Sequence, residues 1–141
     1  MIRRILIPVD GSPPSKRAVE FAVDEWPDAE FTLLHVINPV EAGYSPSAGV
    51  PSGAEEWYEG ARAESESILT GTASEFPPEA TIETTSEVGR PSQTIVEVAE
   101  EEGFDLVVVG SHGRKGVSRI LLGSVAESVV RNSTVPVTVV R

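Results

Sequence analysis

The sequence predicts an α/β fold with a doubly wound, five-stranded parallel sheet in the order 3-2-1-4-5. Its 141 residues are enough for one domain with a single sizeable core. Short apolar runs alternate with segments of helical spacing, which favours parallel strands joined by right-handed helical crossovers. Several of these runs are almost continuously apolar, as is typical of strands covered on both faces. We therefore expect a single domain over residues 1–141.

Five segments are expected to form the strands. In chain order they are Ile2–Val9, Phe31–Ile37, Thr81–Val88, Phe104–Val109 and Val135–Val140. The third alternates and is the most polar, which fits an edge strand. The fifth is apolar and lies at the other edge of the predicted order.

Four helices are expected between these strands. Ser12 is expected to cap the first, because Pro13 suits the first position of a helix. The second follows a loop rich in Pro, Gly and Ser over residues 38–53 and ends before the prolines at 77 and 78. The third starts at Pro91 and ends at Gly103, and the fourth starts at Gly123 and Ser124.

Composition excludes several classes of site. The chain has no cysteine and two histidines in unrelated contexts, which argues against a disulfide framework or a zinc site. The net charge of −11 disfavours general binding to nucleic acid or anionic membranes. The N-terminal apolar run is too short for a signal peptide or a membrane span. These features predict a cytoplasmic protein.

Charge is distributed unevenly along the chain. Residues 111–141 carry five bases and one acid, whereas the preceding residues are strongly acidic. This local reversal favours an anionic ligand near the only basic segment, although scattered surface charge would also explain it. The chain has only two lysines, Lys16 and Lys115. An acidic, lysine-poor surface predicts a halophilic protein, because salt screens the repulsion between its charges.

A ligand site is expected where strands one and four end. In open α/β sheets, ligands bind beyond the carboxyl ends of the strands, where the strand order reverses. Asp10 follows the first predicted strand, and Gly110 follows the fourth. A glycine-rich loop then leads to the helix beginning near Ser124, whose free N–H groups suit a phosphate. Both features therefore predict one phosphate-binding crevice.

Structural explanations exist for the same residues. Ser124 and Glu127 fit a capping box, which needs no ligand. Asp10 and the glycine after it fit a simple turn. His35, inside an apolar run, is expected to be a packed core residue. The acidic clusters at 55–56 and 100–102 are expected to lie on solvated helix faces.

Three motifs stand out in the sequence: Gly110-x2-Gly113-x9-Gly123-Ser124, Pro8-Val9-Asp10-Gly11-Ser12 and Ser111-His112-Gly113-Arg114. Together they make the chain resemble the nucleotide-binding subgroup of the universal stress protein family. The resemblance covers essentially the whole chain. It implies a Rossmann-like, adenine nucleotide α-hydrolase-like fold that binds ATP with Mg²⁺ and acts in stress survival. The residues it implies for the site are Pro8, Asp10, Val36, Gly110, Ser111, Gly113, Arg114, Gly123, Ser124 and Val125.

The resemblance also implies roles for these residues. Asp10 would touch the ribose or a phosphate-bound metal ion, and the Val36 backbone would hold adenine. Gly110 and Gly113 would line the ribose and phosphates, and residues 123–125 would cradle the phosphates.

Three functions remain open on the sequence. The first is an ATP-binding regulatory module with slow or no hydrolysis, because no P-loop lysine or evident general base accompanies the glycines. The second is an enzyme of nucleotide α-phosphate chemistry, of the ATP pyrophosphatase or adenylating type. The third is an interaction protein with a vestigial pocket. The apolar edge strand Val135–Val140 predicts a homodimer.

Overall fold

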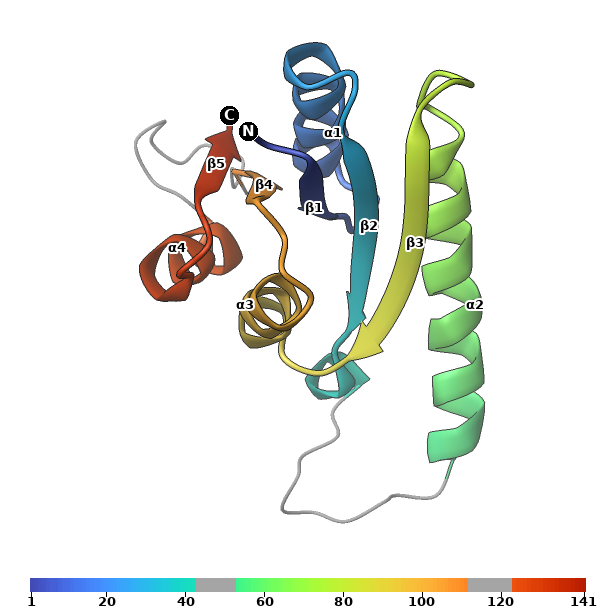
Figure 1. Ribbon diagram of the computed structural model, residues 1–141. Coiled ribbons are helices and arrows are strands. Elements are labelled where there is room, and N and C mark those ends of the chain that lie inside the picture. The colour runs from blue at the N-terminus through green and yellow to red at the C-terminus, as the bar shows by residue number, and fades with distance from the viewer. Residues whose placement is uncertain (43–52, 112–122) are drawn as a thin grey trace.

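Five parallel strands form the centre of the molecule. The computed structural model describes residues 1–42, 53–111 and 123–141, and its strands lie in the order β3-β2-β1-β4-β5 (Figure 1). In chain order they are β1 (Arg4–Pro8), β2 (Glu30–Ile37), β3 (Thr81–Val88), β4 (Leu106–Gly110) and β5 (Val137–Val140). Every neighbouring pair is parallel. The expected fold class and strand order are therefore confirmed.

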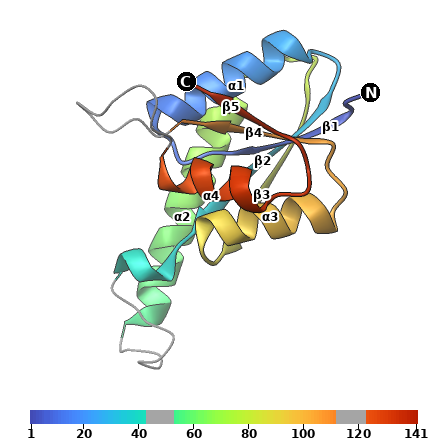
Figure 2. The same cartoon turned by 90° about the vertical axis from the view of Figure 1, so that its left-hand side faces the viewer.

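Helices cover both faces of this sheet. They are α1 (Pro13–Glu25), α2 (Ala54–Ala73), α3 (Pro91–Glu101) and α4 (Ser124–Asn132), with a short 3₁₀ helix η1 (Pro39–Ala42) after β2. Helices α1 and α2 pack on one face, and α3 and α4 pack on the other (Figure 2).

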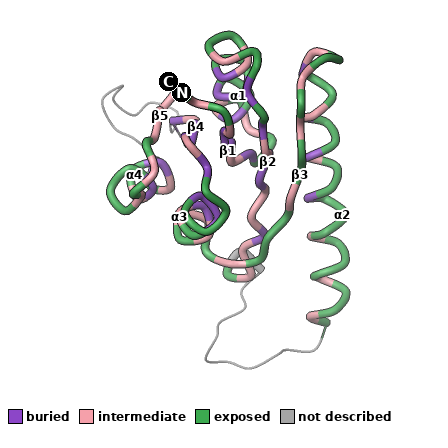
Figure 3. Tube along the Cα trace, viewed as in Figure 1, coloured by how far each residue is buried: buried purple, intermediate pink, exposed green. Residues whose placement is uncertain are grey.

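The central strands are buried on both faces because successive side chains point to opposite sides of a sheet. Ile5 and Ile7 of β1 join the core beneath α1 and α2. Leu6, between them, joins the core beneath α3 and α4. Figure 3 shows the same pattern, with buried residues along the central strands and exposed residues along the outer side of α2.

Strands β1, β4 and β5 each begin two residues later than the apolar runs predict. The backbone N–H of Phe104 donates to the carbonyl of Ala99 at 3.0 Å, so Phe104 belongs to the turn that follows α3. The N–H of Val135 donates to the hydroxyl of Ser133 at 3.1 Å. Both apolar side chains pack into the core from turns, and apolarity alone does not separate such turns from strands.

The two edges of the sheet differ in character. Strand β3 forms the polar edge, as predicted, and most of its residues are exposed. Strand β5 forms the opposite edge, and all four of its residues are half-buried. No helix in the described part of the chain is long and apolar enough to cross a membrane.

Candidate functional site

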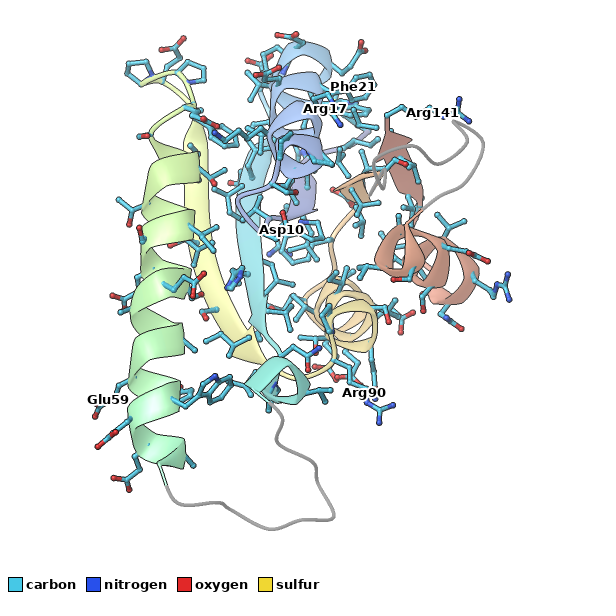
Figure 4. All side chains as sticks on the ribbon, turned by 180° about the vertical axis from the view of Figure 1, so that it is seen from behind. Asp10, Arg17, Phe21, Glu59, Arg90 and Arg141 are labelled. Atoms are coloured by element: carbon cyan, nitrogen blue, oxygen red, sulfur yellow. The ribbon has the colours of Figure 1, made fainter. Side chains whose placement is uncertain are left out.

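The strand order reverses between β1 and β4, which are neighbours in the sheet. The chain leaves β1 for α1 on one face, and it leaves β4 toward α4 on the other. The carboxyl ends of these two strands therefore lie at one edge, with the starts of α1 and α4 on either side. Figure 4 labels Asp10 in the turn between β1 and α1. Pro8, a predicted site residue, is the last residue of β1 and pairs with Leu34.

Asp10 is held in a tight turn. Its Oδ1 accepts hydrogen bonds from the backbone N–H of Ser12, at 2.9 Å, and from the Ser12 hydroxyl. Gly11 has a φ of 80°, a conformation that glycine adopts without strain. Ser12 occupies the N-cap position of α1 as predicted, but its side chain makes no capping hydrogen bond to the helix. The carboxylate of Asp10 is therefore fixed at the carboxyl end of β1.

The start of α1 is a poor anion site. Its first two residues, Pro13 and Pro14, have no backbone N–H. The hydroxyl of Ser15 donates to the carbonyl of Ser12 at 3.1 Å, and the N–H of Lys16 donates to the same carbonyl. Of the two helices that start beside the carboxyl ends of β1 and β4, α1 therefore offers fewer donors to a phosphate.

Gly110 lies against the start of α1. A Cβ atom placed on Gly110 would stand 2.3 Å from the backbone carbonyl oxygen of Pro14. The φ of Gly110 is not positive, so this position needs glycine for close packing and not for backbone freedom. Ser111 follows it, is buried, and donates its backbone N–H to the carbonyl of Val140 at 2.7 Å.

The start of α4 differs from the sequence prediction. Gly123 is the N-cap residue, with φ −65° and ψ 159°, and Ser124 is the first helical residue. The alternative of a capping box is wrong, because Ser124 is not the N-cap residue and no described side chain caps α4. The Glu127 carboxylate instead accepts a hydrogen bond from Arg131 at 2.7 Å.

The missing cap leaves donors open at this helix end. The first intrahelical bond of α4 runs from the Glu127 N–H to the carbonyl of Gly123 at 2.9 Å. The N–H groups of Ser124, Val125 and Ala126 make no hydrogen bond to any residue that the structure describes. Such groups, with the positive end of the helix dipole, bind anions well.

The backbone N–H and carbonyl of Val36 are also not used in the sheet. Alternate residues of a central parallel strand bond to opposite neighbours. The carbonyl of Leu34 accepts the N–H of Val9 from the β1 side, whereas that of Ile37 accepts the N–H of Gly89 after β3. The N–H and carbonyl of Val36 therefore face the β1 side, where β1 has already ended at Pro8. Within the described ranges, neither group has a hydrogen-bond partner.

One polar cluster was missed by the sequence reasoning. His35 is half-buried, and its Nδ1 shares a hydrogen bond of 2.7 Å with the hydroxyl of Ser65 on α2. Ser65 shares a second, of 2.9 Å, with the hydroxyl of Ser86 on β3. His35 is therefore not the packed core residue that the sequence predicts, because its side chain is half-buried and makes a polar contact to α2. A serine at helical spacing from the apolar Ile68 and Leu69, and thus on the inner side of α2, was the signal available in the sequence.

Two predicted site residues, Gly113 and Arg114, lie outside the described residues, as do His112 and Lys115.

Within residues 1–42, 53–111 and 123–141, no group of three His, Cys, Asp or Glu side chains is arranged to hold a metal ion.

The model of the universal stress protein family matches residues 1–141. Universal stress protein MJ0531 of Methanocaldococcus jannaschii is 35% identical over 147 residues, which cover 100% of this chain and 83% of the relative. The solved structure of protein MJ0577 from the same organism superimposes with a TM-score of 0.84 at 32% identity, covering 99% of this chain and 96% of that one. A universal stress protein solved in complex with cAMP gives a TM-score of 0.68 at 28% identity, covering 99% and 97%. The chain therefore belongs to the universal stress protein family.

Proposed function

We propose that the protein binds ATP, or another adenine nucleotide, at the crevice between β1 and β4. The observation that carries this proposal is the open backbone of Val36, which presents one N–H donor and one carbonyl acceptor on the same edge of β2. The Watson–Crick edge of adenine offers the complementary pair, an acceptor at N1 and a donor at N6. The similar structure that holds cAMP supports the same ligand class.

The phosphates would lie at the start of α4. Gly123, Ser124 and Val125 supply the uncapped helix end, and the start of α1 offers fewer donors. Between base and phosphates, Asp10 would accept a hydrogen bond from a ribose hydroxyl, and Gly110 and Ser111 would line the sugar. Pro8, Gly113 and Arg114 remain predicted contacts to the same ligand. This order, from Val36 across the end of β1 to α4, follows the crevice where the strand order reverses.

Mg²⁺ bound to the phosphates would neutralise part of their charge. The carboxylate of Asp10 suits an indirect contact to such an ion, because it is exposed and held by Ser12. Carboxylates, phosphate oxygens and water are the ligands that Mg²⁺ prefers.

We propose that the protein acts as a nucleotide-dependent regulatory module in the stress response of the cytoplasm, and that it hydrolyses ATP slowly or not at all. The one histidine in the described ranges, His35, points its side chain to α2, on the opposite face of β2 from Val36. It is therefore not available as a general base beside the phosphates. We further propose that the whole chain is one domain and that two copies pair through β5.

The test is calorimetry with ATP and Mg²⁺ on wild type, Ser124→Pro and Ser124→Ala. Proline suits the first helical position and lacks an N–H, and the extended ψ of 159° at Gly123 accommodates a following proline. Ser124→Ala is the matched control, because it loses the hydroxyl but keeps the N–H. We expect Ser124→Pro to bind ATP about tenfold more weakly than Ser124→Ala, the effect of about one lost charge-assisted hydrogen bond.

Equal affinities of the two variants would contradict the phosphate position at α4. Undetectable binding by wild type would overturn the proposed function. Release of phosphate or pyrophosphate at about 1 s⁻¹ or faster would instead favour an enzyme of nucleotide chemistry.

A further inference from the structure

Three side chains form a polar chain between α2 and the sheet. The Nδ1 of His35 lies 2.7 Å from the hydroxyl oxygen of Ser65, which lies 2.9 Å from the hydroxyl oxygen of Ser86. Ser65 has no exposed surface. A buried hydroxyl stays in place only where its hydrogen bonds are satisfied, so this chain fixes α2 relative to β2 and β3.

The polar chain meets β2 where the strand has lost one neighbour. Strand β1 pairs with β2 only as far as Leu34, so residues 35–37 extend past the end of β1. Over this overhang, β2 keeps ladder partners only on β3, where His35 pairs with Ser86. The overhang is therefore held by hydrogen bonds along a single edge, and α2 supplies the second support.

The same overhang carries the open backbone of Val36. Side chains alternate along a strand, so His35 reaches α2 on one face while the Val36 side chain packs in the core on the α3 side. His35 directly precedes Val36, and the peptide group between them is planar. The direction of the Val36 N–H therefore follows the backbone of His35, which the hydrogen bond between the His35 side chain and Ser65 ties to α2.

We propose that Ser65 is a positioning residue for base recognition. Through His35, it fixes the overhang of β2 and holds the N–H and carbonyl of Val36 in the direction that a purine edge requires. This inference rests on the proposed function, and it assigns the choice of base to a contact on the opposite face of the sheet. Helix α2, which lies alongside β3 (Figure 1), thereby becomes part of the site without touching the ligand.

Hypoxanthine provides the probe for this role. Its N1 is a donor and its O6 is an acceptor, the reverse of adenine, so a correctly placed Val36 backbone rejects it. A site built to hydrogen-bond one pattern discriminates strongly against its reverse, because its own polar groups are left unpaired. The ratio of ATP affinity to ITP affinity therefore measures the direction of the Val36 backbone, while the contacts to the triphosphate cancel.

The experiment measures this ratio by calorimetry, with Mg²⁺, for wild type, Ser65→Ala and Thr72→Ala. Thr72 is the matched control, because it is also a buried hydroxyl on α2, but it donates to the carbonyl of Ile68 within the helix at 2.8 Å. We expect Ser65→Ala to lower the ATP-to-ITP ratio by about fivefold to tenfold, the range for one misplaced hydrogen bond. Thr72→Ala should keep the wild-type ratio.

A second variant covers the case in which Ser65→Ala fails to fold. Ser86 is exposed and forms the outer end of the polar chain. Ser86→Ala removes the hydrogen bond between Ser86 and Ser65 but leaves the one between Ser65 and His35. The ratio of ATP affinity to ITP affinity should therefore fall by about twofold. An unchanged ratio in Ser86→Ala and in any folded Ser65→Ala would overturn the proposal.

Amide hydrogen exchange separates this proposal from the proposed function. The N–H of Gly89 donates to the carbonyl of Ile37 at 2.9 Å, and it reports on the overhang without any ligand. Its exchange should accelerate in Ser65→Ala and not in Thr72→Ala. If wild type binds ATP and the ATP-to-ITP affinity ratio is the same in Ser65→Ala as in Thr72→Ala, only the positioning role of Ser65 is refuted. Wild type that binds neither nucleotide refutes the proposed function, and the exchange of Gly89 then still decides whether Ser65 anchors β2.

Discussion

At the scale of single residues, Gly110 shows how close packing alone can require a glycine. The backbone of Gly110 approaches the carbonyl of Pro14 so closely that a side chain has no room. The contact holds the end of β4 against the start of α1, and these two segments border the crevice. A glycine at position 110 is therefore required for the packing of β4 against α1, whether or not a ligand binds there.

Gly110→Ala should destabilise the fold. The added Cβ would stand 2.3 Å from the Pro14 carbonyl oxygen, a backbone atom that moves only with α1. We expect a loss of about 1–3 kcal/mol in the free energy of unfolding, the range for forcing extra volume into a packed site. Urea unfolding followed by circular dichroism measures it.

Gly71→Ala is the control for this substitution. Gly71 is an exposed residue of α2 with no atom within 4 Å of an added Cβ. Because alanine is the better helix former, this variant should gain about 0.5–1 kcal/mol. If Gly110→Ala unfolds with the same free energy as wild type, the close approach of residue 110 to the Pro14 carbonyl is relieved easily, which would contradict this prediction.

Asp105 stabilises the opposite end of the sheet in a pH-dependent way. Its carboxylate accepts the backbone N–H groups of Arg4, at 2.9 Å, and Arg3, at 3.0 Å, and these bonds lower the pKa of Asp105 below 3.8. A lowered pKa in the folded state gives stability that is present above the unfolded pKa and is lost as the pH falls through the folded pKa.

Asp105→Asn should therefore be less stable than wild type at neutral pH, and the difference should shrink as the pH falls from about 6 to about 2. Urea unfolding of both proteins across this range measures the difference. A difference that stays constant with pH would mean that the charge of Asp105 does not contribute.

At the scale of elements, the edge strand β5 bonds to β4 on one side and has no strand partner among the described residues on the other. The carbonyl of Pro136 accepts the N–H of Val107, and the carbonyl of Val140 accepts that of Ser111. Even-numbered residues of β5 thus bond to β4, and the N–H of Val139 points away from the sheet. An apolar edge with open N–H and carbonyl groups is suited to pairing with a second copy.

Val139→Pro should convert the proposed homodimer to a monomer. Proline is tolerated on an edge strand where the N–H faces outward, so the ladder between β4 and β5 should survive. Light scattering should give twice the 15.0 kDa chain mass for wild type and a single chain mass for the variant. A monomeric wild type, or a dimeric variant, would contradict pairing through β5.

At the scale of the whole molecule, the chain is strongly acidic, and few ion pairs form within its described part. The net charge is −11, and in the described part of the chain only three ion pairs form, all between exposed side chains. Surface ion pairs of this kind contribute little to the free energy of folding. Mutual repulsion between the carboxylates therefore opposes folding at low salt.

The melting temperature should therefore rise from low to molar KCl, because salt screens this repulsion. Differential scanning fluorimetry across a salt series, with glycerol as a control for general stabilisation by cosolvent, measures the effect. A melting temperature that does not rise would refute the prediction of a halophilic protein.

The fold was predictable from the sequence because each strand is a continuous apolar or alternating run. The sequence also predicted that Asp10 and Gly110 lie at the carboxyl ends of strands that meet where the order reverses, and Gly110 is indeed the last residue of β4. The Val36 backbone was assigned to adenine only by resemblance, because its opening depends on β1 ending before β2. The capping box was wrong because the sequence fits either Gly123 or Ser124 as the N-cap residue of α4. Only the extended backbone at Gly123 shows that Gly123 is the N-cap residue.

The contact between His35 and Ser65 was not predictable either. Thirty positions separate the two residues, and their meeting depends on how α2 lies across β2. A buried serine in an apolar stripe signals that a partner exists, but it does not identify that partner.

The most direct test of the proposed site is a titration of the protein with ATP and Mg²⁺, followed by the backbone amide signals in ¹H–¹⁵N spectra. The amides of Val36, Ser124 and Val125 should shift together along one saturable curve, while that of Arg4, at the other end of β1, should stay unchanged. Saturable shifts that leave Val36 and Ser124 unaffected, or no shifts at all, would contradict a nucleotide held between β2 and α4.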